Sequence, residues 1–135
     1  MAARKSILVS VSVCCAVTIL LAAEPRVTIR EFDVPTPGSR PHDPAVAPDG
    51  SLWYTGQAAN KLGRLDPVSG KFKEFPLKTP SSGPHGLAAD ADGNIWFTAI
   101  SKGYIGKLDP RSGAVTEYHL PDGADDPHTP VFDPP

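Results

Sequence analysis

The chain has 135 residues, with 13 basic and 15 acidic side chains and a formal net charge of −2. This balance argues against a nucleic-acid partner, because such proteins carry a basic surface. Apolar residues make up 40% and aromatic residues 7% of the chain, so we expect one compact domain at most, with a modest core. With 12 glycines and 16 prolines, the chain would resemble a disordered one unless it has a sequence period.

Residues 1–23 have the pattern of a secretory signal peptide. A basic pair at positions 4–5 precedes a long uncharged apolar run, which ends in small residues before Glu24. This pattern predicts cleavage after residue 23 and a secreted or periplasmic protein without membrane contact. An uncleaved membrane anchor is the alternative.

Both cysteines of the chain, Cys14 and Cys15, lie inside this predicted signal. After cleavage the protein would have no thiol. We therefore expect no disulfide, no cysteine zinc ligand and no covalently attached haem.

The chain repeats itself at an offset of 43 residues. Aligning residues 32–74 on 75–117 gives 18 identities in 43 pairs. The recurring residues include Glu31, Glu74 and Glu117, then His42, His85 and His128, and the pair Trp53 and Trp96. A period of this length is typical of propeller blades or of helical pairs.

The composition of the second repeat favours strands over helices. Short runs rich in branched and aromatic residues, separated by turn sequences, predict strands at 86–90, 95–98, 104–108 and 115–120. Glycine or proline interrupts every window that could hold a helical period. The sequence therefore predicts an all-β protein built from four-stranded antiparallel blades, which is a β-propeller.

The repeat also predicts the domain organisation of residues 24–135. Complete blades are expected at 43–77 and 86–120, a lone outer strand at 28–35, and the start of a further blade at 128–135. Propellers close with roughly four to eight blades, so we expect this sequence to be a fragment of a longer ring. A protein that truly ended at Pro135 would expose two apolar blade faces and would need to oligomerise.

Residues 84–98 read Pro-His-Gly-Leu-Ala-Ala-Asp-Ala-Asp-Gly-Asn-Ile-Trp-Phe-Thr, and Ile-Gly-Lys-Leu-Asp-Pro follows at 105–110. The first repeat has Pro-His at 41–42 and Asp-Gly-Ser-Leu-Trp-Tyr-Thr at 49–55. These motifs, in this order and at blade spacing, resemble the repeats of the virginiamycin B lyase (streptogramin lyase) family. The resemblance covers residues 28–135 and is more specific for the propeller subfamily than for the reaction.

The resemblance implies a seven-bladed propeller and a carbon–oxygen lyase that confers antibiotic resistance. Such an enzyme opens a small cyclic peptide, a streptogramin B antibiotic, by elimination at its ester linkage with the help of Mg²⁺. In the family the Pro-His histidines of late blades meet the substrate and supply the base. The matching positions here are His42, His85 and His128, which are our candidate catalytic residues.

The family's metal ligands are glutamates just after the Trp-Phe motif. This sequence has Gly56 and Ala99 at those positions. Magnesium is therefore a possible cofactor that the residues present do not support, and the metal ligands stay unknown.

Two readings of the repeated residues remain open. A histidine that recurs in every repeat is often a scaffold residue, whereas three histidines at one mouth of the channel could act as base or metal ligands. The recurring tryptophans fit packing between blades. The loss of the glutamates favours a second function, a non-catalytic secreted propeller that binds a protein, peptide or glycan.

Overall fold

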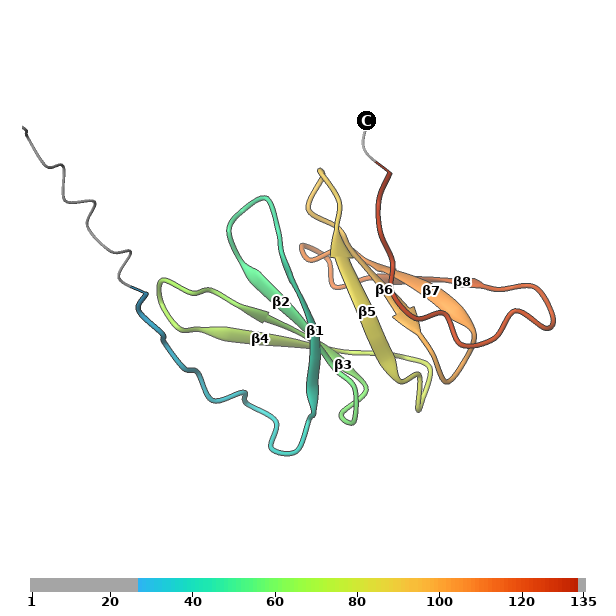
Figure 1. Cartoon of the computed structure of the whole chain (residues 1–135), viewed down its shortest axis with the longest axis horizontal. Coiled ribbons are helices and arrows are strands. Elements are labelled where there is room, and N and C mark those ends of the chain that lie inside the picture. Colours follow the sequence, from blue (N-terminus) through green and yellow to red (C-terminus); the bar gives the residue numbers. More distant parts are fainter. Residues whose placement is uncertain (1–26, 134–135) are drawn as a thin grey trace, which may run out of the picture. The chain divides into compact units, whose positions relative to one another are not determined.

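The computed structural model describes residues 27–133, so the predicted signal peptide lies outside the described residues. Two four-stranded antiparallel sheets make up this part of the chain (Figure 1). The first contains β1 (Pro41–Val46), β2 (Leu52–Gly56), β3 (Lys61–Leu65) and β4 (Phe72–Pro76). The second contains β5 (Pro84–Ala89), β6 (Ile95–Ala99), β7 (Tyr104–Leu108) and β8 (Val115–His119). Between residues 27 and 133 we find no helix long and apolar enough to cross a membrane.

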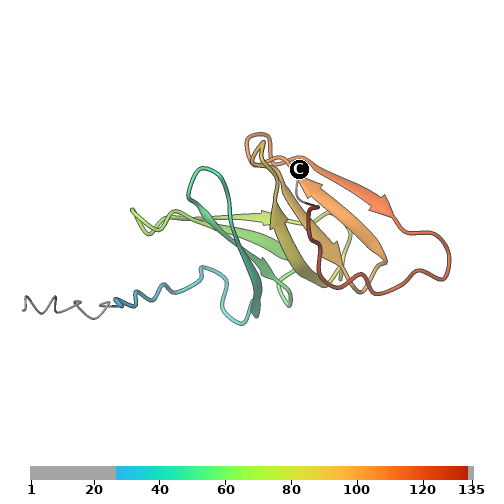
Figure 2. The ribbon, with the colours of Figure 1, turned by 45° about the horizontal axis from the view of Figure 1, so that its top comes forward.

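The prediction of an all-β fold with four strands per repeat is confirmed. In each sheet the strands follow one another in chain order, as in a propeller blade (Figure 2). The structure has no strand at 28–35, where the sequence predicts an outer one, and none at 128–133. An outer strand at 28–35 would pair with a third strand of its own blade, and no described residue supplies that strand.

The core is shared by the two sheets. Trp53 stacks on Phe75 with ring centroids 5.3 Å apart, and Gly113 of the second repeat lies against the same Phe75 ring. The buried cluster comprises Ala47, Trp53, Leu62, Phe75, Leu77, Leu87, Ile95, Phe97, Ala99, Tyr104 and Leu108. Trp53 is thus a core residue as expected, whereas Trp96 is only partly buried. The blades are therefore held together by apolar packing.

A glycine faces an aromatic ring at the centre of each sheet. Gly63 pairs with Tyr54 and Gly106 pairs with Phe97 across the two middle strands. A Cβ at either glycine would overlap the ring opposite, so the recurring glycine leaves room for the recurring aromatic residue. This explains why the repeat keeps both positions.

Aspartates accept hydrogen bonds in the turns between strands. Asp49 accepts hydrogen bonds from the backbone N–H and the hydroxyl of Ser51, and it pairs with Arg64 at 2.9 Å. The turn of the second repeat differs, because Asp90 rather than Asp92 accepts the N–H of Asn94, at 2.8 Å. A carboxylate in a turn satisfies backbone donors that no strand partner reaches.

A threonine hydroxyl ties each blade to the histidine segment that begins the following repeat. Thr55 on β2 donates to the carbonyl oxygen of His85 at 2.9 Å. One repeat later, Thr98 on β6 donates to the carbonyl of His128 at 2.6 Å. Each bond spans 30 residues, so the contact recurs with the sequence period.

We predict that Thr55→Val lowers the free energy of unfolding by about 1–3 kcal/mol, because the buried carbonyl of His85 loses its donor. Valine keeps the branched shape of threonine, so packing changes little. Urea denaturation followed by tryptophan fluorescence measures the change. Thr55→Ser keeps the hydroxyl and is the control. If Thr55→Ser lowers the free energy of unfolding as much as Thr55→Val does, the hydrogen-bond explanation is contradicted.

We predict that Asp49 stabilises the fold at neutral pH and ceases to do so in acid. The hydrogen bonds from Ser51 lower the pKa of Asp49 from 3.8 to about 2, and Arg64 adds to the effect. Because the folded pKa lies below the unfolded one, the stabilisation is complete above the unfolded value and is lost as pH falls through the folded value.

The measurement is the unfolding free energy of the natural protein and of Asp49→Asn between about pH 5 and pH 2. The natural protein should be the more stable at the upper limit, and the difference should shrink toward the lower one. A difference that stays constant over this range would show that the charge of Asp49 does not contribute.

Candidate functional site

The three candidate histidines converge although they lie 43 residues apart in sequence. His42 and His85 stand near the starts of β1 and β5, and His128 follows β8. The ring centroids of His42 and His85 are 4.1 Å apart, and those of His85 and His128 are 4.0 Å apart. We call these three residues the histidine row. The fold thus brings the three rings together, and their chemical role stays a prediction.

An acid that the sequence analysis missed stands beside the histidine row. Asp43 Oδ1 lies 2.8 Å from His42 Nδ1, and Asp43 Oδ2 lies 4.0 Å from His85 Nδ1. The equivalent positions in the later repeats are Gly86 and Thr129. This departure from the repeat is the signal that could have identified Asp43.

A β-bulge explains how neighbouring residues reach the same place. On β1, Pro41 pairs with Gly56 and Pro44 with Tyr54, so His42 and Asp43 together face the single residue Thr55. The extra residue breaks the alternation of side chains between the two faces of the sheet. The second repeat has the same bulge, where His85 and Gly86 face Thr98.

His85 is the buried member of the row, with 7% of its surface exposed. Its Nδ1 atom is buried and has no hydrogen-bond partner among the described residues. Burial lowers the pKa of His85, the imidazoles of His128 and His42 lower it further, and the Asp43 carboxylate acts in the opposite direction. The ring is therefore held in its neutral form, which has a lone pair for a proton or a metal ion.

The residues of these blades do not fit the magnesium site that the resemblance implies. Gly56 has no side chain, and a Cβ there would lie 3.4 Å from the carbonyl oxygen of Lys61. Ala99 is fully buried and offers no oxygen. Magnesium is bound chiefly by carboxylate and other oxygen ligands, so neither position can hold it.

A polar hollow of about 450 Å³ opens at the strand ends, and Arg40 in its lining lies two residues before His42. It lies among the segments that precede β1, β3 and β5 and those that follow β2 and β6, and it is lined by Arg40, Gln57, Ala58, Asn60, Ser81, Gly83, Ile100 and Ser101. Arg40 adopts a left-handed backbone, with φ of 52°. The volume of the hollow is within the range of about 300–1,000 Å³ that small-molecule sites occupy.

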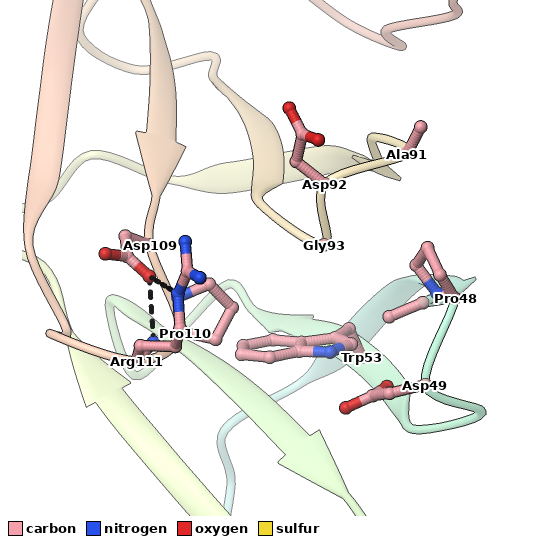
Figure 3. A pocket seen from close by; sticks show the side chains of 10 residues that line it. Pro48, Asp49, Trp53, Ala91, Asp92, Gly93, Asp109, Pro110 and Arg111 are labelled. Atoms are coloured by element: carbon pink, nitrogen blue, oxygen red, sulfur yellow. Dashed lines mark hydrogen bonds and ion pairs between the residues drawn. The ribbon is translucent and has the colours of Figure 1, made fainter.

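A second hollow lies beyond the other end of β1, between the two blades (Figure 3). It measures about 250 Å³ and has the face of Trp53 on one side and the turn that carries Arg111 on another. Two of its carboxylates are already bonded, Asp49 to Ser51 and Asp109 to Arg111. Its smaller volume and engaged acids make it a weaker candidate than the end that carries the histidine row.

A family model described as the Virginiamycin B lyase family matches residues 21–134. Among solved structures, virginiamycin B lyase from Staphylococcus aureus is 36% identical, with a TM-score of 0.70 over 76% of this chain and 34% of that one. A catalytically inactive histidine-to-alanine variant of virginiamycin B lyase from the same organism, solved with quinupristin, gives the same values.

A streptogramin B lyase structure is 40% identical, with a TM-score of 0.71 and the same coverage. Among curated proteins, none matches the chain. The chain spans about a third of the length of these solved relatives. Because the family model covers most of the sequence and the blades superpose at this identity, the chain belongs to the virginiamycin B lyase family.

Proposed function

We propose that the protein is an exported carbon–oxygen lyase of the virginiamycin B lyase type, which opens an ester-linked cyclic peptide by elimination. The observation that carries the proposal is the convergence of three repeat histidines into one row. A hollow large enough for part of a peptide opens at the strand ends, where Arg40 precedes the segment that carries His42. Family membership supports the reaction class, and the inactive histidine-to-alanine relative shows that a histidine is essential in that enzyme.

In this reaction a base removes the proton from a carbon next to a carbonyl group. The electron pair forms a carbon–carbon double bond, and the bond from the neighbouring carbon to the ester oxygen breaks. The carboxylate leaves, and no water is consumed. The protein must therefore supply a neutral base, and it must hold the peptide so that its proton lies within hydrogen-bond reach of that base.

Within the histidine row we assign the base to His128. Its ring is exposed, and its Nδ1 lies 3.1 Å from the hydroxyl of Thr129 rather than against a carboxylate. His85 is buried and His42 is paired with Asp43, so both are less available to a substrate. The hydrogen bonds from Thr98 and from the N–H of Gly86 to the His128 carbonyl fix the backbone that carries this ring.

The polar hollow supplies the second requirement. Arg40 and the amide of Gln57 line it, and these side chains are donors suited to the carbonyl groups of a peptide. The amide of Asn60 is already bonded to the carbonyl oxygens of Leu77 and Thr79. Arg40 directly precedes the segment that carries His42, so the hollow and the histidine row belong to the same end of the blades. A cyclic peptide lying over this end would contact both.

The alternative is a propeller that binds a peptide, protein or glycan without turnover. The absence of carboxylates at Gly56 and Ala99 favours it, because the two described blades then lack the oxygen ligands that magnesium needs. The two functions differ in one measurable respect, which is whether the bound peptide is opened.

We expect the full-length protein to open a streptogramin B antibiotic to a linear product with the mass of the substrate, as elimination requires. Liquid chromatography with mass spectrometry measures the product, and a parallel reaction in heavy-oxygen water should give no label. A product that gains the mass of water would overturn the elimination. Binding by calorimetry without any product would overturn the lyase and favour the binding protein.

We also expect His128→Ala to reduce kcat by about 10²–10⁴-fold, the usual contribution of a general base. His119→Ala is the control, because that side chain is exposed and lies 3.8 Å from Glu117, on β8. Unchanged turnover in His128→Ala would remove His128 from the mechanism.

A further inference from the structure

We propose that His42, Asp43 and His85 form a binding site for a divalent transition-metal ion of the Zn²⁺ class. Nothing in the family resemblance assigns this site, whose donors are two imidazoles and a carboxylate rather than glutamates. The proposal concerns metal binding and does not depend on the lyase reaction.

The donor atoms are already close to the spacing that such an ion needs. One donor atom from each of the three residues lies within 4.8 Å of the other two. Zinc binds nitrogen and oxygen at roughly 2.0–2.2 Å, which places tetrahedral ligands about 3.4 Å apart. A small rotation of the Asp43 and His85 side chains would therefore bring the three donors onto one ion.

The unpartnered nitrogen of His85 points to a ligand. Its Nδ1 is buried without a hydrogen-bond partner among the described residues, and it faces Asp43 Oδ2 at 4.0 Å. A buried polar atom without a partner destabilises a fold by about 1–3 kcal/mol, so it needs an explanation. An ion between this nitrogen and the carboxylate would satisfy both.

The backbone around the site is fixed before any ion binds. Thr55 donates to the carbonyl of His85, and the bulge on β1 places His42 and Asp43 opposite the same Thr55. Ligands that sit on paired strands lose little freedom on binding, which favours a specific site over a loose surface contact.

The second repeat shows what the site requires. His85 and His128 make the same ring contact one repeat later, with centroids 4.0 Å apart, but the residue after His85 is Gly86. A Cβ at Gly86 would overlap the backbone of the segment 128–129, so no side chain fits there. Within residues 27–133, Asp43 is thus the one acid that a bulge places beside the row.

The donor set indicates the class of ion. Imidazole nitrogen suits zinc, copper, nickel and iron, whereas magnesium and calcium prefer oxygen ligands throughout. Two histidines and one carboxylate leave at least one coordination position for water or another molecule. His42 is about a third exposed, so an ion held here can exchange with solvent.

The test uses the full-length protein without an affinity tag, stripped with a chelator and then titrated with Zn²⁺ in competition with a chromogenic indicator. We expect one ion per chain. Asp43→Asn and His85→Gln should each weaken Zn²⁺ binding at least about tenfold. Co²⁺ in place of zinc should give visible absorption bands of a low-symmetry site, and these bands should be absent in Asp43→Asn.

His119→Gln is the matched control, because it removes an exposed histidine on β8 and should leave Zn²⁺ affinity unchanged. Asp43→Gly places the residue of the second repeat in the first and provides a second loss variant if asparagine disturbs folding. Binding that survives both Asp43 variants, an equal loss in His119→Gln, or no stoichiometric Zn²⁺ uptake by the natural protein would each overturn the proposal.

Discussion

The arrangement of this protein depends on a threonine hydroxyl that reaches from one blade to the next. Thr55 and Thr98 close the Trp-aromatic-Thr motif of each repeat, and each donates to the backbone carbonyl of a histidine 30 residues later. A hydrogen bond from a threonine side chain to a backbone carbonyl fixes the position of the accepting segment, whichever side chain that segment carries. The spacing of the histidine rings therefore follows from the packing of the blades. A substitution of either threonine would displace the histidine segments more than the apolar core.

The two repeats show how one backbone supports unlike chemistry. The first strand of each repeat, β1 or β5, has a bulge at which two residues face one threonine of the next strand. In the second repeat the bulge holds Gly86, which lets segment 128–130 approach the strand closely and accept the Gly86 N–H. In the first repeat the same position holds Asp43, so a carboxylate lies where the later repeat has a backbone contact. One copy favours packing, and the other places a charge beside two imidazoles.

The sequence period was sufficient to predict the blades and the candidate histidines. It was not sufficient for Asp43 or for the cap at Asp90, because a comparison of repeats selects what recurs, whereas these residues are departures from the repeat. The bulges also escaped prediction, since one extra residue in a strand leaves no periodic signal. Residues 28–35 form no strand in the structure. Whether a segment forms a strand depends on a neighbouring strand to pair with, and a repeat alignment contains no information about that neighbour.

The bulge on β1 separates the residues that build the blade from those that can acquire a new role. Beyond it, residues 44–46 pair regularly with β2 and keep the register that buries Trp53. His42 and Asp43, at the bulge of β1, lie outside that register and outside the apolar core, so substitutions there leave the pairing of β1 with β2 intact. Gly86, at the second bulge, has no room for a side chain. The bulge of the first repeat thus has room for a different side chain at a point where the second repeat has none. A propeller built this way can acquire new chemistry at one blade while the register of its strands stays the same.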